Sequence, residues 1–390
     1  MENKYLAYIG NWGMKPGSGD YGITACVYDP ADGSLTATGS VLPEVHVGNV
    51  YIDQERKILY CVDEQMKHED FHGLGGGGKL FAVKIENDGN LREINHTYSF
   101  APLPSYVTID SRRKYALLTN HSGGDPITVA EKDAEGNFHP VLHYSDASLV
   151  LYRLNEDGSV GPAIDIFKAT GHGILPKQSM PHLHSVSESA EMKLFFVCDK
   201  GCNKVYSFKI QNDQLIKCDE YADQEGSAPR YGLVLEKQNL FLYNHEASTE
   251  VTILRFDENG SLSFVESVPL LPENSSDEKK ESSDIKRSPD GKTFYNIIRG
   301  INIISVIRQN PQTNSFQVSQ LVHFNATTFP GGGARGCAVS PDGKYLYVCV
   351  ADDGDIHCFP INDDGTLRDE DHIQHMGHPA NITFCAENIQ

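Results

Sequence analysis

Basic residues recur near the starts of strand-like segments in this sequence, at spacings that could gather them in one place. Aligning the segments on their proline-like positions puts one residue of each at a common point: Gly48, Ser105, His182, Arg230, Ser283, Arg335 and Ala380. A purely structural position would favour small or apolar residues, yet three of these seven are basic. Arginine binds carboxylate or phosphate through two parallel hydrogen bonds. If these residues converge, they predict an anion-binding pocket.

A second set of polar residues follows the next strand of each repeat. It includes Asn120-His121, Asp199-Lys200, Asn244-His245-Glu246 and Arg299-Gly300. Together with Arg230, Arg299, Arg335, His182 and Lys286, these positions predict an electropositive pocket that also contains acids. Acids and bases on one face suit proton transfer and charge stabilisation.

Several of these residues also have a structural interpretation. Arg230 and Arg335 could pair with acids of neighbouring repeats, and Glu246 could be a solvated loop residue. His184 lies where the other repeats were aligned on apolar residues, so it could be a hydrogen-bonded core histidine. His182 and His184 lie two apart on a strand and could bind a metal, but no third ligand accompanies them, so we predict no metal site.

Two alternating patterns organise the chain. The first is a turn followed by an apolar strand, as in Ser288-Pro289-Asp290-Gly291 and Ser340-Pro341-Asp342-Gly343, where Pro-Asp-Gly closes a hairpin. The second is an alternating strand that ends in an acidic or Asn-rich turn, as in residues 80–91 and 356–367. We count six full copies of the first pattern and seven of the second.

The missing copy is divided between the two termini. Residues 4–9 resemble the strand that follows a Pro-Asp-Gly turn, and residues 379–384 resemble the strand that precedes one. Seven units average about 55 residues each, close to known propeller repeats. We predict an all-β, seven-bladed β-propeller of four-stranded antiparallel blades, one domain over residues 1–390. The ring is closed by pairing the N- and C-terminal strands, which removes exposed sheet edges.

This topology predicts where a site must lie. The start of each first strand and the loop after each second strand share one face of the disc, around the central channel, where a small ligand would bind. Three long loops are expected to rise from this face, at residues 12–21, 66–78 and 124–148. The third is predicted to be an insertion over the active face that could act as a lid.

Composition excludes several classes of partner. With 53 acidic and 33 basic residues, the formal net charge is −20, which repels phosphate backbones and anionic lipid, so we expect neither nucleic acid nor membrane as a partner. The N-terminus lacks the pattern of a secretory signal. The nine cysteines contain no CxxC pair and mostly lie in apolar runs, which predicts buried free thiols in a reducing cytoplasm. The oligomeric state stays open.

The chain resembles the seven-bladed propeller lactonases, which include bacterial propeller-type 6-phosphogluconolactonases and fungal carboxymuconate-lactonizing enzymes. The resemblance rests on Pro181-His182-Leu183-His184, Ala228-Pro229-Arg230, Leu271-Pro272-Glu273, Arg299-Gly300 and Gly333-Ala334-Arg335-Gly336. Tyr231 stands where the family has histidine, and Lys200 where it has leucine.

The resemblance implies four catalytic residues, namely His184, Arg230, Arg299 and a glutamate that falls near Glu246. Because His245 intervenes in the run Asn244-His245-Glu246, either residue could take the glutamate's place. The remaining pocket residues are then predicted to bind substrate: His182, Arg335, His245, Lys286, Asn120, His121 and Asp199.

The function expected from these residues and the resemblance is cofactor-independent hydrolysis of a small anionic sugar lactone. Glu246, helped by His184, would activate water, and Arg230 and Arg299 would hold the oxyanion and the anionic group. Two alternatives remain. The same site could add a carboxylate across a double bond, as a cycloisomerase, or the propeller could bind a peptide without catalysis.

Overall fold

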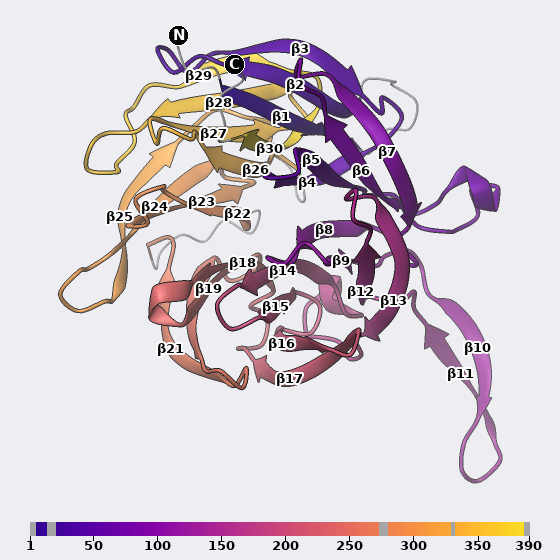
Figure 1. Ribbon diagram of the computed structural model, residues 1–390. Coiled ribbons are helices and arrows are strands. Elements are labelled where there is room, and N and C mark those ends of the chain that lie inside the picture. Colours follow the sequence, from indigo (N-terminus) through magenta and orange to yellow (C-terminus); the bar gives the residue numbers. More distant parts are fainter. Residues whose placement is uncertain (1–4, 14–20, 273–279, 329–331, 386–390) are drawn as a thin grey trace.

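Seven four-stranded antiparallel sheets surround a central axis in the computed structural model, which describes residues 5–13, 21–272, 280–328 and 332–385 (Figure 1). The predicted seven-bladed propeller is therefore confirmed. Most of the loop expected at residues 12–21 and the end of the Leu271-Pro272-Glu273 motif lie outside the described residues.

The strands of each blade run outward from the axis, because the first strands of neighbouring blades contact one another around the ring. Blade 1 contains β30 (Pro379–Cys385), β1 (Tyr5–Asn11), β2 (Gly22–Tyr28) and β3 (Leu35–Val41). Blade 2 contains β4 (Val47–Asp53), β5 (Ile58–Asp63), β6 (Lys79–Ile85) and β7 (Leu91–Tyr98). Blade 3 contains β8 (Pro104–Ile109), β9 (Tyr115–Asn120), β12 (Ser148–Leu154) and β13 (Val160–Lys168).

The remaining blades follow the same order without interruption. Blade 4 contains β14 (Leu183–Ser189), β15 (Leu194–Asp199), β16 (Lys204–Gln211) and β17 (Gln214–Ala222). Blade 5 contains β18 (Pro229–Leu235), β19 (Leu240–His245), β20 (Glu250–Phe256) and β21 (Leu262–Pro269). Blade 6 contains β22 (Glu281–Arg287), β23 (Thr293–Arg299), β24 (Ile303–Gln309) and β25 (Phe316–His323). Blade 7 contains β26 (Ala334–Val339), β27 (Tyr345–Val350), β28 (Asp355–Pro360) and β29 (His372–His375).

The two ends of the chain close the ring as expected. β1 pairs with β30 in antiparallel register, with Leu6 opposite Cys385 and Ile9 opposite Ile382. Blade 1 is thus built from the first and the last strand of the chain, and β1 and β30 lie side by side in Figure 1. This pairing covers the strand edges that an open array would expose.

The apolar core is divided among the seven interfaces between blades. Each of seven buried clusters joins residues of two neighbouring blades. Successive residues of one strand face opposite neighbours, since Leu117 packs toward blade 4 and Leu118 toward blade 2. The middle strands are therefore apolar on both faces, which explains why they read as continuous apolar runs.

Tyrosine hydroxyls tie several blades to the turns of the next blade. Tyr60, Tyr295 and Tyr347 donate to the carbonyl oxygens of Gly158, Gly365 and Gly33, at 2.7, 3.0 and 2.7 Å. Each glycine belongs to the acidic turn of the second sequence pattern and has a positive φ, which favours glycine there.

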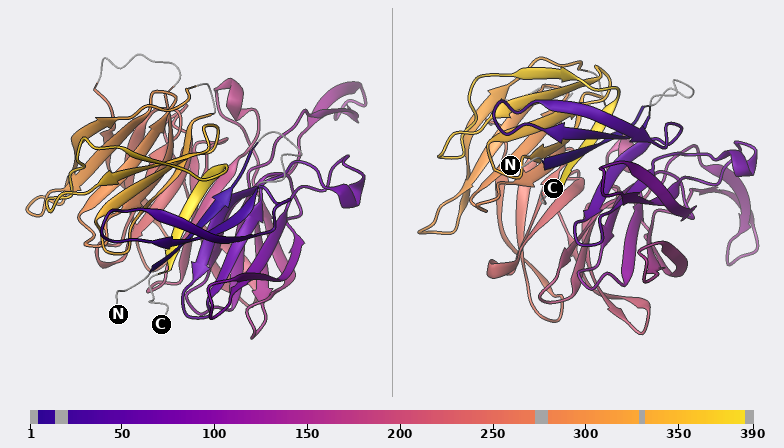
Figure 2. Two further views of the ribbon diagram at one scale, coloured as in Figure 1. Left: turned by 90° about the horizontal axis from the view of Figure 1, so that it is seen from above. Right: turned by 45° about the horizontal axis from the view of Figure 1, so that its top comes forward.

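The insertion at residues 124–148 forms a hairpin of β10 (Ile127–Lys132) and β11 (Phe138–His143). It stands outside the ring and does not cross the centre, so the prediction of a lid over the channel is wrong (Figures 1 and 2). The insertion joins β9 to β12, the two middle strands of blade 3, and its hairpin projects outward from that blade.

Short 3₁₀ turns are the only helical elements among the described residues: η1 (Glu69–Phe71), η2 (Pro176–Gln178) and η3 (Glu236–Gln238). Within the same residues, no helix has the length and apolar character needed to cross a membrane. All nine cysteines are free thiols, and eight of them are buried, as the sequence predicts.

Candidate functional site

A β-bulge interrupts the first strand of every blade near its start. The pairing register shifts there in all seven sheets, and the bulges contain Gly48, Ser105, His184, Arg230, Ser283, Arg335 and Ala380. A bulge changes the direction of the side chain that it carries. Four of these positions hold glycine, alanine or serine, while the other three present His184, Arg230 and Arg335.

The alignment made from the sequence is wrong by two residues in blade 4. It assigned His182 to this position because Pro181 was matched to Pro104, Pro229 and Pro379. In the structure those three prolines pair with the ends of their second strands, and the residue that does so in blade 4 is Leu183, opposite Asp199. His184 is therefore the bulge residue, and it does not take the core position of the other repeats.

In several blades, the side chain of the last residue of the second strand forms hydrogen bonds with the backbone just before the first strand of the same blade. Asp63 accepts a hydrogen bond from the amide of His46, and Asp199 accepts one from the amide of His182. Asp199 also accepts from the amides of Gly201 and Cys202. Asn120 donates to Ser99 O and Ser148 Oγ, at 2.8 and 3.0 Å. Asp199 and Asn120, predicted to bind substrate, are thus bonded within the blade framework.

His245 occupies the same register position as Asp63, Asn120 and Asp199. It lies opposite Pro229, and its ring pairs with Asp223 at 3.0 Å and contacts Ser248 at 2.8 Å. Glu246 follows it, in the position held by Lys200 in blade 4. Compared with the corresponding loop of blade 4, the run Asn244-His245-Glu246 contains no extra residue, and the side chain placed beside the arginines is that of Glu246.

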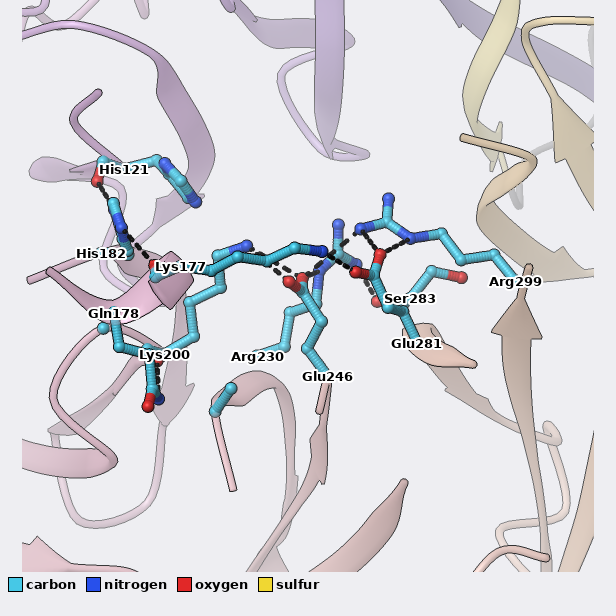
Figure 3. Close-up of polar contacts among 12 residues, drawn as sticks. His121, Lys177, Gln178, His182, Lys200, Arg230, Glu246, Glu281, Ser283 and Arg299 are labelled. Atoms are coloured by element: carbon cyan, nitrogen blue, oxygen red, sulfur yellow. Dashed lines mark hydrogen bonds and ion pairs between the residues drawn. The ribbon is translucent and has the colours of Figure 1, made fainter. Parts of the chain in front are cut away.

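Glu246 lies at the centre of a charged cluster (Figure 3). Lys200 Nζ is 2.8 and 2.9 Å from its two carboxylate oxygens. Arg230 Nε is 2.8 Å from Oε2, and Arg299 Nη2 is 3.6 Å from the same oxygen. Arg230 also donates to Ser283 O. Since Glu246 is only 5% exposed, these contacts are largely desolvated.

A second carboxylate extends the cluster into blade 6. Glu281 accepts from Arg299 Nε at 3.0 Å, contacts Arg299 Nη2 at 2.8 Å, and pairs with Lys177. Sequence analysis did not select Glu281 or Lys177, because neither belongs to a repeated pattern. Lys200 belongs to the polar positions expected after the second strands and departs from the family pattern, but the sequence assigned it no role. Its position next to Asp199 matches that of Glu246 next to His245.

The cations control the ionisation of Glu246. Burial alone would raise its pKa, but the charges of Lys200, Arg299 and Arg230 outweigh burial and hold the pKa well below its usual value. Burial also lowers the pKa of Lys200, although Glu246 opposes that shift. The pair consequently presents an ionised carboxylate inside a net cationic environment.

Three histidines, His121, His182 and His184, gather next to this cluster. The rings of His121 and His182 stack at 4.3 Å, and the ring of His184 lies 5.8 Å from His121 and 4.9 Å from Tyr231. His184 is 6% exposed, and its Nδ1 has no hydrogen-bond partner among the described residues. Burial, followed by the charges of Arg230 and Lys200, lowers the pKa of His184 well below its usual value, so the ring is neutral at pH 7.

His182 differs from His184 in having partners on both ring nitrogens. Nδ1 is 2.9 Å from His121 O, and Nε2 is 3.1 Å from Lys177 O. The ring therefore bridges two loops on this face. His182 and His121 lie next to the cluster, but the contacts of His182 are with backbone carbonyl groups.

Arg335 and Lys286 form pairs of their own. Arg335 pairs with Glu64 at 3.2 Å. Lys286 pairs with the buried Asp284 at 2.8 Å, and its ammonium lies 5.4 Å from the centre of the Tyr231 ring. Asp284 also accepts from the amide of Cys337 at 3.0 Å, which joins blade 6 to blade 7. Neither cation is among those that contact Glu246.

A pocket of about 300 Å³ opens onto the cluster. Its lining residues are Leu175, Pro176, Lys177, Gln178, Lys200, Ala228, Glu246, Ala247, Lys280 and Glu281. A larger pocket of about 650 Å³ lies on blade 2, beside residues 65–69, and includes His46 and Lys79. We assign the site to the smaller pocket, because Glu246, its partner Lys200 and the second carboxylate Glu281 line it. Within the described part of the chain, no three His, Cys, Asp or Glu residues converge in a way that could hold a metal.

Comparisons with known proteins agree with this architecture. A family model described as lactonase, 7-bladed beta-propeller, matches residues 7–384. A protein of Formosa agariphila named 6-phosphogluconolactonase is 27% identical over 345 residues, which is 86% of each chain. A protein of Bacillus subtilis with the same name is 22% identical over 358 residues, or 91% of each chain.

Solved structures show the same fold. The periplasmic gluconolactonase of Pseudomonas aeruginosa superposes with a TM-score of 0.80 at 19% identity, covering 98% of this chain and 99% of that protein. A Lactobacillus plantarum protein gives a TM-score of 0.80 at 18% identity, with 98% and 99% covered. At this level of identity the likeness concerns the fold.

Proposed function

The chain belongs to the seven-bladed β-propeller lactonase family, and on that premise we propose that it hydrolyses a small anionic sugar lactone without a cofactor. The two relatives named 6-phosphogluconolactonase support a substrate of this class. The observation that carries the proposal is the arrangement of Lys200, Arg230 and Arg299 around the carboxylate of Glu246, beside a pocket.

The first step is attack of water on the lactone carbonyl carbon. The carbon–oxygen double bond gives its electron pair to the carbonyl oxygen, which becomes an oxyanion in a tetrahedral intermediate. Arg230 and Arg299 stabilise that charge in a buried environment, where charge-assisted hydrogen bonds are strong. The ring carbon–oxygen bond then breaks, leaving a carboxylate and a hydroxyl group.

Glu246 removes the proton from the attacking water. In the free protein its three cationic neighbours make it a weak base, since they hold its pKa low. An anionic substrate that draws Arg230 and Arg299 toward itself raises the basicity of Glu246 as the reaction begins. Protonated Glu246 then returns this proton to the ring oxygen as the ring bond breaks. Neutral His184, with an unpartnered Nδ1, is the second proton-transfer group and accepts the proton that the new carboxylic acid loses.

The test measures initial hydrolysis rates of 6-phosphogluconolactone and gluconolactone above the uncatalysed rate. Glu246→Gln is expected to lower kcat by about 10²- to 10⁴-fold. Arg230→Met is expected to lower it by about 10²- to 10³-fold. Lys292→Ala is the control, because Lys292 is exposed and pairs only loosely with Asp290, at 3.8 Å.

Two results would contradict the proposal. One is a wild-type rate in both Arg230→Ala and Glu246→Ala. The other is turnover of a muconate with no turnover of any lactone, which would support the cycloisomerase alternative instead.

A further inference from the structure

Two lysines outside the proposed catalytic set approach the pocket from blade 4. Figure 3 shows Lys177 and Lys200 reaching Glu281 and Glu246 from the side of His182, whereas Arg299 arrives from the opposite side. Both lysines line the pocket. Of the four cations in the cluster, these two are therefore the ones that a ligand in the pocket contacts.

The segments that carry the two lysines are tied together by one buried side chain. Gln178 is 2% exposed, and its Nε2 donates to Lys200 O at 2.7 Å and to Asn203 Oδ1 at 2.6 Å. On the other side of the turn, Lys177 O is 3.1 Å from His182 Nε2. These contacts fix the backbone of both segments. The two lysine side chains therefore extend from backbone positions that are already ordered before a ligand binds.

The charges around the pocket do not balance. Lys177, Lys200, Arg230 and Arg299 supply four positive charges to the cluster, while Glu246 and Glu281 supply two negative charges, and Lys280 is a further cation in the pocket lining. Lys177 is the most accessible of the four cations, with a side chain that is 64% exposed. Its partner Glu281 also accepts a hydrogen bond from Arg299. An incoming anion can therefore form an ion pair with Lys177 while Glu281 keeps Arg299 as a partner.

We propose that Lys177 and Lys200 form a subsite for a phosphate or carboxylate group that the substrate carries at the end remote from its lactone carbonyl. The identity of the substrate as a lactone rests on the proposed function, but the anion site does not. With the carbonyl at Glu246 and the arginines, the tail lies toward η2, and the apolar side chains of Leu175, Pro176 and Ala247 border its carbon chain. Lys177 then determines specificity for charged over uncharged lactones.

The kinetic test compares 6-phosphogluconolactone with gluconolactone, which lacks the phosphate. Lys177→Met is expected to raise KM for the phosphorylated lactone by about 10- to 100-fold, the effect of one charge-assisted hydrogen bond. It should change kcat by less than about threefold and leave KM for gluconolactone unchanged. Lys177→Arg should restore most of the loss, and Lys292→Met is the matched control. An equal change in KM for both lactones, or no change, would overturn the proposal.

A binding experiment separates this subsite from the proposed function. Isothermal titration with gluconate 6-phosphate, with the dicarboxylate glucarate and with neutral glucose distinguishes phosphate from carboxylate recognition. Weaker binding of either anion by Lys177→Met and Lys200→Met, but not by Lys292→Met, supports the subsite even if the wild type hydrolyses no lactone. Anion affinity that is the same in all four proteins rejects it even if the protein is a lactonase.

Discussion

Arg335 of blade 7 reaches past blade 1 to pair with Glu64 of blade 2, with 3.2 Å between Nη2 and Oε1. Its guanidinium lies 3.6 Å from the centre of the Trp12 ring, which belongs to the intervening blade. Each side chain of the pair is 15% exposed. The interaction joins two blades that are not neighbours, and it packs against the blade between them.

This pair should contribute measurable coupling to stability. In a double-mutant cycle of Glu64→Gln and Arg335→Met, the coupling in the free energy of unfolding is expected to be about 1–3 kcal/mol, because the two charges are mostly shielded from water. Urea unfolding of the four proteins gives this quantity. Additive effects of the two changes would mean that the pair contributes nothing beyond its separate side chains.

The ionisation of Glu246 predicts a specific pH dependence. Glu246→Gln should cost about 3–5 kcal/mol at neutral pH, since it leaves buried cations without their partner. The folded-state pKa lies well below the ordinary value of 4.5, so the stability supplied by Glu246 is present above pH 4.5 and is lost as the pH falls through the folded-state pKa. The difference between wild type and variant, measured by chemical unfolding, should therefore shrink in acid. A constant difference down to the lowest accessible pH would contradict this ionisation.

His184 and His245 should titrate on opposite sides of the ordinary histidine pKa. Burial lowers the pKa of His184 well below 6.5, whereas for His245 the bonds to Asp223 and Glu250 outweigh burial and raise the pKa. Imidazole NMR resonances, assigned with His184→Gln and His245→Gln, are expected to show His184 neutral well below pH 6.5 and His245 still charged above it. The reverse order would show that the charges around the two rings differ from those described.

The inter-blade tyrosines offer a matched test of packing. Tyr347→Phe removes a buried hydrogen bond of 2.7 Å to Gly33 O and should lower the free energy of unfolding by about 1–2 kcal/mol. Tyr345→Phe removes a longer contact of 3.4 Å to Ala31 O at the surface and should cost less than about 0.5 kcal/mol. Equal losses in the two variants would contradict the role given to the buried hydroxyl.

Several parts of the site could be anticipated from local patterns. Arg230 and Arg335 were assigned to the first-strand position because a proline or a clear repeat marks it, and the register agrees. His184 was misaligned because Pro181 was matched to the proline that precedes the bulge residue in other blades. In blade 4 the residue at that position is Leu183, two residues further along the chain. A β-bulge shifts the period-two alternation by one residue, but the first four residues of β14 are all buried, so the spacing alone could not reveal which histidine the bulge carries.

The repeat architecture, the ring closure and the face on which the polar loops gather were all determined by the sequence, because turn chemistry and period-two alternation are local properties repeated seven times. The tertiary structure decided which side chains meet. Glu281 and Lys177 lie 104 residues apart in the sequence. Their contact depends on the relative positions of blades 4, 5 and 6 around the axis. No local pattern encodes that distance, since it arises only when the interfaces between the blades have packed.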